Sequence, residues 1–388
     1  MFLTTKNKNE CCGCKACEQI CSQNAIRMVC DPEGFWYPEV DVDKCIGCKK
    51  CLQVCSFNAD INCIVQEQKV YAAWHKESRV RDRSSSGGFF FEIAKKVIEN
   101  NGKVIGAVFD DKFIVKHIVV DNLRDLGRLL RSKYVQSDTS GIFKLTKKLI
   151  NNGDTVLFSG TPCQIEAVYS YLGSKPENLI TCEVICFGVP SPQIYRGFLD
   201  YLEKKYKTDI TDINFKDKSY GWENYRTRIL FKNGRLFSEF PKDSYSRMMN
   251  ARLSTRPSCD VCNMHNGSGL ADFTLGDFWG IEKYGLKNIP KNGVSFVKVN
   301  STTGYNMWQC IKDFFEHQLI TNFLPSKNNV IANNLRTSFY LDLRNKGYAY
   351  VADTYFKSWR YRNIIAKSKF LIKSKISLCF KWILNARK

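Results

Sequence analysis

From about Lys69 onward, short apolar runs typical of buried strands alternate with segments whose apolar residues recur at helical spacing. Ser86 precedes one helical segment and Gly102 follows it, so we expect a helix over residues 86–101 with Ser86 as its N-cap. This alternating order predicts an α/β domain. The expected strands are 70–74, 103–109, 112–120, 155–159 and 178–188, and further helices are expected over 141–153 and 161–172.

Residues 226–240 have Asn233-Gly234 at their centre, a pair typical of the tight turn between two antiparallel strands. An antiparallel hairpin favours a mixed sheet over a purely parallel one. The segment before this region is dominated by cysteines. We therefore expect an α+β chain with a cysteine-rich domain at 1–62, two parts of a larger α/β domain at 66–150 and 151–330, and a basic, partly helical tail at 331–388.

Cysteines recur twice at the interval C-x2-C-x2-C-x3-C. In this pattern three thiolates surround one 4Fe–4S cluster and the fourth reaches the neighbouring cluster. Zinc sites more often pair two C-x2-C units across a longer gap, so the spacing favours a bacterial-ferredoxin-like module with two clusters over zinc or disulfides. Cys12 adjoins the first loop, so a ligand set that uses Cys12 in a shifted register stays an alternative. We expect one cluster on Cys11, Cys14, Cys17 and Cys55, and the other on Cys45, Cys48, Cys51 and Cys21.

A second group of cysteines lies in the larger domain. Cys259 and Cys262 form a single C-x2-C unit, which is half of a metal site. Cys163 and Cys186 each follow a predicted buried strand and complete a set of four, for which we expect a third 4Fe–4S cluster. Structural zinc is the alternative. Cys182 competes with Cys186 as a ligand, because residues four apart on a strand share one face.

Composition and charge narrow the classes of protein that fit. The chain has 388 residues, 44% of them hydrophobic, which excludes a mainly disordered chain. Its formal charge of +20 favours an acidic partner. The first ten residues lack the apolar core of a signal peptide, and no run reaches the roughly 20 apolar residues that span a bilayer. Because iron–sulfur clusters need a reducing compartment, we expect a cytoplasmic protein.

The basic excess is concentrated at the C-terminus. Between Lys357 and Lys388 there are ten Lys or Arg and no Asp or Glu, with isoleucines at helical spacing. This pattern predicts a basic amphipathic helix that lies on an anionic membrane, on a partner protein or on its own domain. No nucleic-acid reader fold or interleaved basic and aromatic platform is recognisable, so nucleic acid is not an expected partner.

The ferredoxin-like module is followed by the ordered motifs SSSGGFF, SKYVQSD, SGTPCQIEA, CFGVPSP, RPSCDVC and LGDFWG. Together they resemble the family of the beta subunit of coenzyme F420 hydrogenase and dehydrogenase, to about residue 320. The resemblance implies bound FAD, which takes electrons singly from iron–sulfur clusters and reacts in two-electron steps. It places the extra cluster on Cys163, Cys186, Cys259 and Cys262, and flavin contacts at Ser86, Gly87, Gly88, Lys133, Ser137, Gly160, Thr161 and Pro162.

One position departs from the family pattern, because the usual Cys-His-Gly before VPSP has Phe187 in place of the histidine. The resulting hypothesis is a flavin-dependent oxidoreductase that takes electrons from an acidic donor such as ferredoxin. Its acceptor would be a small molecule, either a deazaflavin or a biosynthetic, polysaccharide-related substrate. His75 and Lys133 are candidate proton donors or substrate anchors. The alternative is an electron-transfer subunit that relays electrons to a separate catalytic chain.

Overall fold

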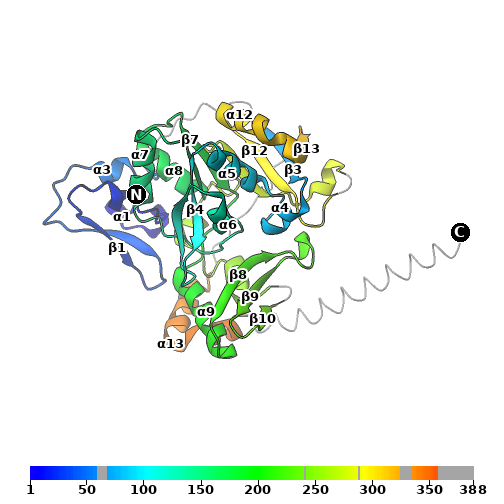
Figure 1. The fold of residues 1–388 in the computed structure, drawn as a ribbon. Coiled ribbons are helices and arrows are strands. Elements are labelled where there is room, and N and C mark those ends of the chain that lie inside the picture. The colour runs from blue at the N-terminus through cyan, green and yellow to red at the C-terminus, as the bar shows by residue number, and fades with distance from the viewer. Residues whose placement is uncertain (59–67, 240–241, 287–288, 324–333, 357–388) are drawn as a thin grey trace.

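The computed structural model describes residues 1–58, 68–239, 242–286, 289–323 and 334–356 (Figure 1). The N-terminal segment pairs β1 (Ile26–Cys30) with β2 (Trp36–Val40) in an antiparallel hairpin. Each expected cysteine loop leads into a short helix, α2 (Ala16–Ile20) or α3 (Lys50–Gln53). In Figure 1 this blue module lies beside helices α7 (Ile142–Asn151) and α8 (Pro162–Leu172) of the larger body. The first helix, α1 (Phe2–Thr5), packs near β2.

An eight-stranded sheet forms the centre of the molecule and confirms the expected mixed α/β architecture. Strands β4, β6, β7 and β11 pair in parallel, whereas β5, β12 and β13 run antiparallel to their neighbours. The order is β13 (Phe315–Ile320), β3 (Lys69–His75), β12 (Ser295–Val299), β11 (Phe273–Asp277), β7 (Leu179–Val184), β6 (Val156–Gly160), β4 (Lys103–Phe109) and β5 (Val115–Val120).

Helices cover both faces of this sheet, because its strands alternate apolar side chains to each side. Leu157 of β6 packs in a hydrophobic cluster with the helices that cover one face of the sheet. Its neighbours Val156 and Phe158 pack with helices of the other face. The first face carries α5 (Phe89–Glu99), α6 (Leu123–Leu129) and α12 (Thr302–Ile311), and the second carries α7 (Ile142–Asn151) and α8 (Pro162–Leu172).

A separate three-stranded antiparallel sheet carries the predicted hairpin. Gly234 in its turn has a φ of +79°, a left-handed value that glycine adopts without a steric penalty. Its aromatic residues form a second core with the helices packed on it. The sheet contains β8 (Ile210–Asp217), β9 (Arg226–Phe231) and β10 (Leu236–Ser238), and its helices are α9 (Pro192–Tyr206), α10 (Ser244–Asn250) and α13 (Arg336–Thr354).

Three predicted boundaries were wrong. The helix expected over 86–101 begins at Phe89, because Gly88 adopts a left-handed conformation at φ +96°, which an α-helix cannot include. Ser86 is therefore not its N-cap, and its hydroxyl donates to the Val294 carbonyl at 2.6 Å. The strand expected over 112–120 begins at Val115, and the one expected over 178–188 ends at Val184. Short helices complete the fold at α4 (Ser78–Arg83), α11 (Pro257–Asp260), Lys8–Glu10, Trp222–Asn224, Ile281–Tyr284 and Lys312–Phe314.

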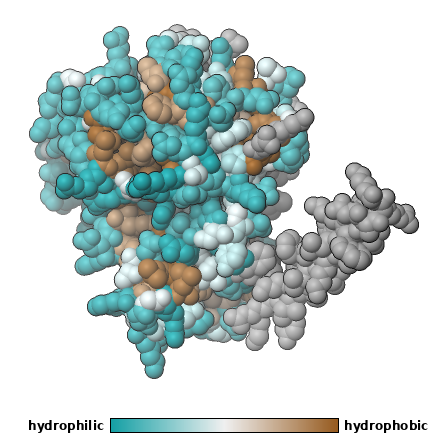
Figure 2. Space-filling model, turned by 45° about the vertical axis from the view of Figure 1, so that its right-hand side comes forward, coloured by the Kyte–Doolittle hydropathy of each residue, from teal (hydrophilic) through white to brown (hydrophobic). Residues whose placement is uncertain are grey.

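The surface has no continuous apolar belt on the side seen in Figure 2, where brown patches are separated by hydrophilic residues. Among the described residues, none of the helices has the length and hydropathy needed to cross a bilayer. The predicted amphipathic helix at 357–388 lies outside the described residues.

Candidate iron–sulfur and cofactor sites

The first cysteine loop surrounds a hollow that residues of the N-terminal module line. Cys11, Cys14, Cys17 and Cys55 all line it. These are the four thiols expected to bind one cluster, although Cys55 comes from the second loop. Gly13 lies inside the loop at φ +72°, where a side chain would be strained. The hollow therefore has the ligand set that a 4Fe–4S cluster requires.

The second loop faces outward. Cys45 and Cys48 are exposed, whereas Cys51 and Cys21 are partly buried. The Cys21 sulfur accepts a hydrogen bond from the Ala25 backbone N–H at 3.3 Å. All the cysteines in the described parts of the chain are free thiols, as expected for cluster ligands rather than disulfides.

The four thiols of the second cysteine group are partly buried and lie at one edge of the large sheet. Adjacent parallel strands β6 and β7 end at this edge, so Cys163 and Cys186 follow neighbouring strand ends. Cys163 lies in the first turn of α8, which begins with the predicted Thr161 cap and Pro162 at the first helical position. Short-range backbone bonds orient two of the sulfurs: Gly188 N–H donates to Cys186 at 3.4 Å, and Met264 N–H donates to Cys262 at 3.3 Å.

The electrostatic interactions of these thiols show that they are neighbours. Burial raises the pKa of Cys186 to about 11, and the Cys262 thiol adds to the shift. Burial likewise raises the pKa of Cys259 to about 12, followed by the effect of Cys186. The neighbouring Cys12 thiol, followed by burial and by the Cys186 thiol, raises the pKa of Cys163. Because a ligand thiol must lose its proton, a bound cation at this place would reverse these shifts.

Cys182 differs from this set. It is fully buried within β7 and packs in the hydrophobic core beneath the helices. Cys186 lies beyond the end of that strand. The two residues are therefore not equivalent positions on one strand face, and the structure favours Cys186 as the fourth thiol.

His265 was missed by the sequence reasoning, although it lies three residues after Cys262. Its Nδ1 is 2.9 Å from the Cys186 carbonyl oxygen, which can only accept, so Nδ1 is the protonated nitrogen. Its Nε2 is buried and has no hydrogen-bond partner. The ring stacks on Phe187, with centroids 6.3 Å apart. A polar atom left free in this position is a further indication that a group binds among these thiols.

Cys12 connects the two cysteine groups. The neighbouring thiols of Cys14 and Cys163 lower the pKa of Cys12. Gln136 donates from its side-chain amide to the Cys12 carbonyl at 3.1 Å. The inner hollow of the N-terminal module and the second thiol group are therefore separated by little more than one side chain.

The segments expected to contact flavin also meet. Ser85 and Ser132 have hydroxyl oxygens 2.9 Å apart, which joins the SSSGG turn to the SKYVQSD segment. Gln164 donates to the Ser137 hydroxyl at 2.9 Å, which joins that segment to α8. Gly87 is tightly packed, since a Cβ there would lie 2.4 Å from the Ala73 carbonyl oxygen. The SSSGG turn lies beyond β3 and the SGTPCQIEA motif beyond β6, strands whose carboxyl ends share one edge of the sheet, where ligands of open α/β sheets bind, and the SKYVQSD segment reaches this edge after α6.

Several of the predicted polar groups have protein partners in this arrangement. The Lys133 ammonium donates to the carbonyls of Arg128 and Leu130, at 2.9 and 2.7 Å. Burial, followed by repulsion from Arg131, lowers the pKa of Lys133 to about 7. Its contact with a flavin stays a prediction. Among the other predicted contacts, Gly160 and Thr161 adjoin the capping side chain of Gln164, which accepts from the Thr161 N–H.

His75 is buried at the end of β3 with a partner on each ring nitrogen. Its Nδ1 accepts from the Glu77 backbone N–H at 3.0 Å. Its Nε2 therefore carries the proton and donates to the Glu92 carboxylate at 3.0 Å. The ring is 1% exposed. The role of His75 as proton donor stays a prediction, for which the ring would have to exchange one of these partners.

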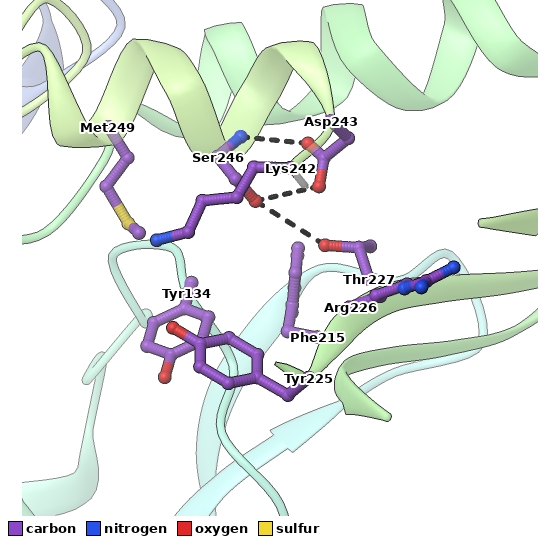
Figure 3. Close-up of a pocket in the computed structure, with 9 residues that line it drawn as sticks. All are labelled: Tyr134, Phe215, Tyr225, Arg226, Thr227, Lys242, Asp243, Ser246 and Met249. Carbon is purple, nitrogen blue, oxygen red and sulfur yellow. Dashed lines mark hydrogen bonds between the residues drawn. The ribbon is translucent and has the colours of Figure 1, made fainter. Parts of the chain in front are cut away.

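A second hollow lies between the SKYVQSD segment and the small sheet (Figure 3). Tyr134 and Tyr225 line one side, and Lys242 extends over them from the opposite wall. Ser246 is fixed there because it donates from its hydroxyl to Asp243 at 2.7 Å. The lining combines two phenols, aliphatic and aromatic surface, the Lys242 ammonium and the Asp243 carboxylate, a mixture of apolar surface with a few polar groups that is typical of small-molecule sites.

Next to this hollow, Asp277 at the end of β11 holds a buried polar cluster. Its carboxylate pairs with the buried Lys216 ammonium and accepts from the Trp222 indole N–H at 3.0 Å. Trp222 stacks on Trp279 with ring centroids 4.4 Å apart. The conspicuous GDFWG motif is thus explained in part by a rigid aromatic and ionic cluster.

In the described part of the chain, no group of three or more His, Cys, Asp or Glu side chains is arranged to hold a single metal ion. A 4Fe–4S cube spreads its four thiolates more widely than one zinc ion does, so the two alternatives for the second thiol group require different spacing.

Comparison with known proteins identifies both parts of the chain. Residues 10–59 match the 4Fe–4S dicluster domain. Residues 153–319 match the family described as the C terminus of the coenzyme F420 hydrogenase/dehydrogenase beta subunit. No curated protein matches. A chain from the F420-reducing NiFe hydrogenase complex of Methanosarcina barkeri is 16% identical, with a TM-score of 0.46 over 78% of this chain and 93% of that chain. The two family matches confirm the resemblance: the chain joins an N-terminal 4Fe–4S dicluster domain to a C-terminal domain of the coenzyme F420 hydrogenase/dehydrogenase beta subunit family.

Proposed function

We propose that the protein is an iron–sulfur flavoprotein oxidoreductase that moves electrons from a one-electron donor, through 4Fe–4S clusters, to FAD and then to a small-molecule acceptor. The observation that supports this proposal is that Arg256 joins the two cysteine groups: it donates to the Cys11 carbonyl at 2.6 Å and accepts from the Cys259 N–H at 2.9 Å. These contacts bring the first cysteine loop close to the second cysteine group. Electron transfer between centres requires that proximity, and the second group also adjoins the segments expected to contact flavin.

The cluster ligands follow from the two thiol groups and the outer loop. Cys11, Cys14, Cys17 and Cys55 would hold the inner cluster of the N-terminal module, and Cys45, Cys48, Cys51 and Cys21 the outer one. Cys163, Cys186, Cys259 and Cys262 would hold the third. Cubanes on these ligands supply single-electron storage, and the surrounding hydrogen bonds adjust their potentials.

Electrons would enter at the outer loop. Cys45 and Cys48 are exposed, and Ile46 between them is 67% exposed, so a donor can approach this loop closely. The formal charge of +20 favours an acidic donor such as ferredoxin, whose association would slow as salt is added. The requirement for a reducing environment points to the cytoplasm.

FAD, when bound, supplies the exchange between one-electron and two-electron chemistry. The residues proposed to hold it are Ser86, Gly87, Gly88, Lys133, Ser137, Gly160, Thr161 and Pro162. Support comes from the hydrogen bonds that join their three segments. Lys133 would offer its ammonium to an anionic group if it left the carbonyls of Arg128 and Leu130.

Our candidate site for the acceptor is the hollow of Figure 3, whose cavity of about 20 Å³ would have to widen to admit a small molecule. Tyr134 belongs to the SKYVQSD segment, so this hollow and the proposed flavin site share one wall. Lys242 favours an anionic acceptor, a class that includes a deazaflavin phosphate and a sugar nucleotide. Lys133, which is partly buried, and His75, which is buried, are the candidate proton donors.

A relay subunit without its own substrate site is the second candidate. The observation in its favour is that the Ser86 hydroxyl and the Lys133 ammonium both bond to backbone carbonyls. The family match to a beta subunit also fits a chain that works within a complex. In that case electrons would leave through a partner protein.

Anaerobic purification followed by iron, sulfide and flavin analysis tests the proposal. About twelve irons and one FAD per chain are expected for the full enzyme. About eight irons with one zinc would make the second thiol group structural. Clusters without flavin would favour the relay, and a colourless protein without sulfide would overturn both candidates. Bleaching of bound flavin by reduced ferredoxin would establish the direction of electron entry.

A further inference from the structure

We propose that Arg256 is the counter-charge of the inner cluster and raises the reduction potential of that cluster. The inference rests on the proposed function in one respect, that Cys11, Cys14, Cys17 and Cys55 hold a cluster. It adds a residue from the larger domain that takes part in setting the properties of the N-terminal module.

Arg256 reaches across the domain boundary to the first cysteine loop. Its Nε donates to the Cys11 carbonyl at 2.6 Å, and one terminal nitrogen lies 3.5 Å from the Cys11 sulfur. The same nitrogen donates to the Trp36 carbonyl at 3.0 Å, and the other donates to the Gln136 side-chain oxygen at 3.2 Å. The guanidinium is therefore held in one orientation, with a donor aimed at a cluster ligand.

The environment of this side chain leaves its charge uncompensated by protein. Arg256 is 0% exposed. Among the described residues, its hydrogen bonds go to carbonyl oxygens, an amide oxygen and a sulfur, and none goes to a carboxylate. The rings of Tyr37 and Phe35 lie 4.3 and 5.4 Å from the guanidinium carbon. Burying a cation without an anion is strongly unfavourable, so this position calls for a negative group.

A 4Fe–4S cluster with four thiolates is that negative group, with a net charge of about −2 in its oxidised form. Reduction adds one further negative charge. A nearby fixed cation stabilises the more negative, reduced form more than the oxidised form, so it shifts the equilibrium toward reduction. Because the guanidinium stays protonated at all physiological pH values, this effect is permanent.

Arg256 also lies beside the next group of thiols on the proposed electron route. It is three residues before Cys259, and its backbone carbonyl accepts from the Cys259 N–H at 2.9 Å. The outer loop has no comparable buried cation among the described contacts. A higher potential at the inner cluster would draw electrons inward from the outer cluster to the boundary with the larger body.

Gly13 fits this arrangement. A Cβ at Gly13 would lie 2.6 Å from a terminal nitrogen of Arg256 and 2.5 Å from the Gln136 side-chain nitrogen. The absence of a side chain in the loop is what lets the guanidinium approach it.

The test is a redox titration monitored by electron paramagnetic resonance on anaerobically purified protein. The variants are Arg256→Gln and Arg256→Lys, and the inner-cluster signal is identified by its loss in Cys11→Ser. The matched control is Arg336→Gln. Arg336 also reaches the N-terminal module, where it pairs with Glu33 at 2.5 Å, but its charge already has a carboxylate partner. It donates as well to the Thr255 carbonyl, next to Arg256.

We expect Arg256→Gln to lower the inner-cluster potential by at least the equivalent of a tenfold change in the reduction equilibrium, about 59 mV for one electron. Arg256→Lys should give a smaller decrease, and Arg336→Gln none. If Arg256→Gln instead loses about four irons while Arg256→Lys and Arg336→Gln keep them, the requirement for the charge is equally supported.

An unchanged potential in Arg256→Gln with full iron content would overturn the inference, as would equal decreases in Arg256→Gln and Arg336→Gln, which would point to domain docking. Loss of the cluster in both Arg256 variants would assign the residue to loop structure alone. Wild-type protein without iron and sulfide would instead be a failure of the proposed function.

Discussion

The Lys15 ammonium and the Asp138 carboxylate lie 2.6 Å apart across the boundary between the N-terminal module and the larger body. Lys15 belongs to the first cysteine loop, and Asp138 ends the SKYVQSD segment. The Lys15 side chain is only 11% exposed, and it also donates to the Ser140 hydroxyl at 2.8 Å. Beside them, the Thr139 hydroxyl donates to the Cys14 carbonyl at 2.7 Å. The loop that would hold the inner cluster is thus anchored on the segment proposed to contact flavin.

We expect Lys15→Gln and Asp138→Asn each to lower the free energy of unfolding by about 0.5–1 kcal/mol at pH 7, since Asp138 is partly exposed. Burial raises the pKa of Asp138, but the hydrogen bonds from Lys15 and Ser140 outweigh it, so the net pKa is lowered. The stabilisation is therefore present above the unfolded pKa of about 3.9 and is lost as pH falls through the lower folded value. Urea unfolding of the single and double variants measures it. Fully additive losses would show that the two residues do not interact.

The fold was largely predictable where local chemistry decides it. The helix expected over 161–172 and the turn at Gly234 appear where the sequence placed them, and the expected strands are present although two of them are shorter than expected. The prediction of Ser86 as an N-cap was wrong because its hydroxyl donates to the carbonyl of Val294, just before β12 and more than 200 residues away in sequence. The hairpin was predicted but not its membership of a separate sheet, since pairing of strands is set by the tertiary core.

In the candidate site, too, local sequence predicts some features and tertiary contacts determine the others. Repeated spacing marks eight thiols of the N-terminal module, because neighbouring residues of one loop share a cluster. The gathering of Cys163, Cys186 and Cys259 depends on which strands lie side by side, which spacing does not encode. Arg256 and His265 have no motif of their own. Arg256 is buried with no hydrogen bond to a carboxylate among the described residues, and His265 is buried with an unpartnered Nε2; only three-dimensional contacts reveal these features.

Cys163→Ser should remove about four of twelve irons and leave the N-terminal pair of clusters intact. Serine is a poor ligand for the cluster, and Cys163 contacts the other thiol group only through its sulfur. The measurement is iron content together with the spectrum of the remaining clusters. Cys182→Ser is the matched control, and it should keep all the irons because that thiol is buried within the strand core. Loss of iron in the control alone would reverse the assignment of Cys182 and Cys186.

Gly87→Ala should destabilise the protein by about 2 kcal/mol or more, because its Cβ would lie 2.4 Å from the Ala73 carbonyl oxygen and 2.6 Å from the Ser295 nitrogen. Both contacts are backbone atoms of the large sheet and have little freedom to move. Gly106→Ala is the control, since the nearest atom there would be a Leu129 methyl carbon at 3.4 Å. Urea denaturation of both variants gives the comparison. Equal, small losses would mean that the turn can move away from the strands.

Asp277→Asn should cost about 3–5 kcal/mol, because it leaves the buried Lys216 ammonium without its anion. The loss of the indole bond to Asp277 should also disturb the stacking of Trp222 on Trp279, which tryptophan fluorescence reports. Asp121→Asn removes a comparable but exposed pair with Lys103 and should cost less than about 1 kcal/mol. A loss in Asp277→Asn no larger than in Asp121→Asn would show that water or another group compensates the Lys216 charge.

Lys133 should make stability depend on pH in the alkaline range. Burial, with repulsion from Arg131, lowers its pKa to about 7, below the value of about 10.4 in an unfolded chain. Between these values the unfolded chain binds more protons, so the free energy of unfolding of the wild type should rise with pH relative to Lys133→Met, by at most about 1.4 kcal/mol per pH unit. Urea unfolding at pH 6.5 and pH 9 measures the difference, with the exposed Lys112→Met as the control for losing one cation. A wild-type advantage that stays constant between pH 6.5 and pH 9 would mean that the carbonyls of Arg128 and Leu130 stabilise the charged ammonium at least as much as burial penalises it. In that case Lys133 would be a permanent cation at the proposed flavin site rather than a group able to give up its proton near neutral pH.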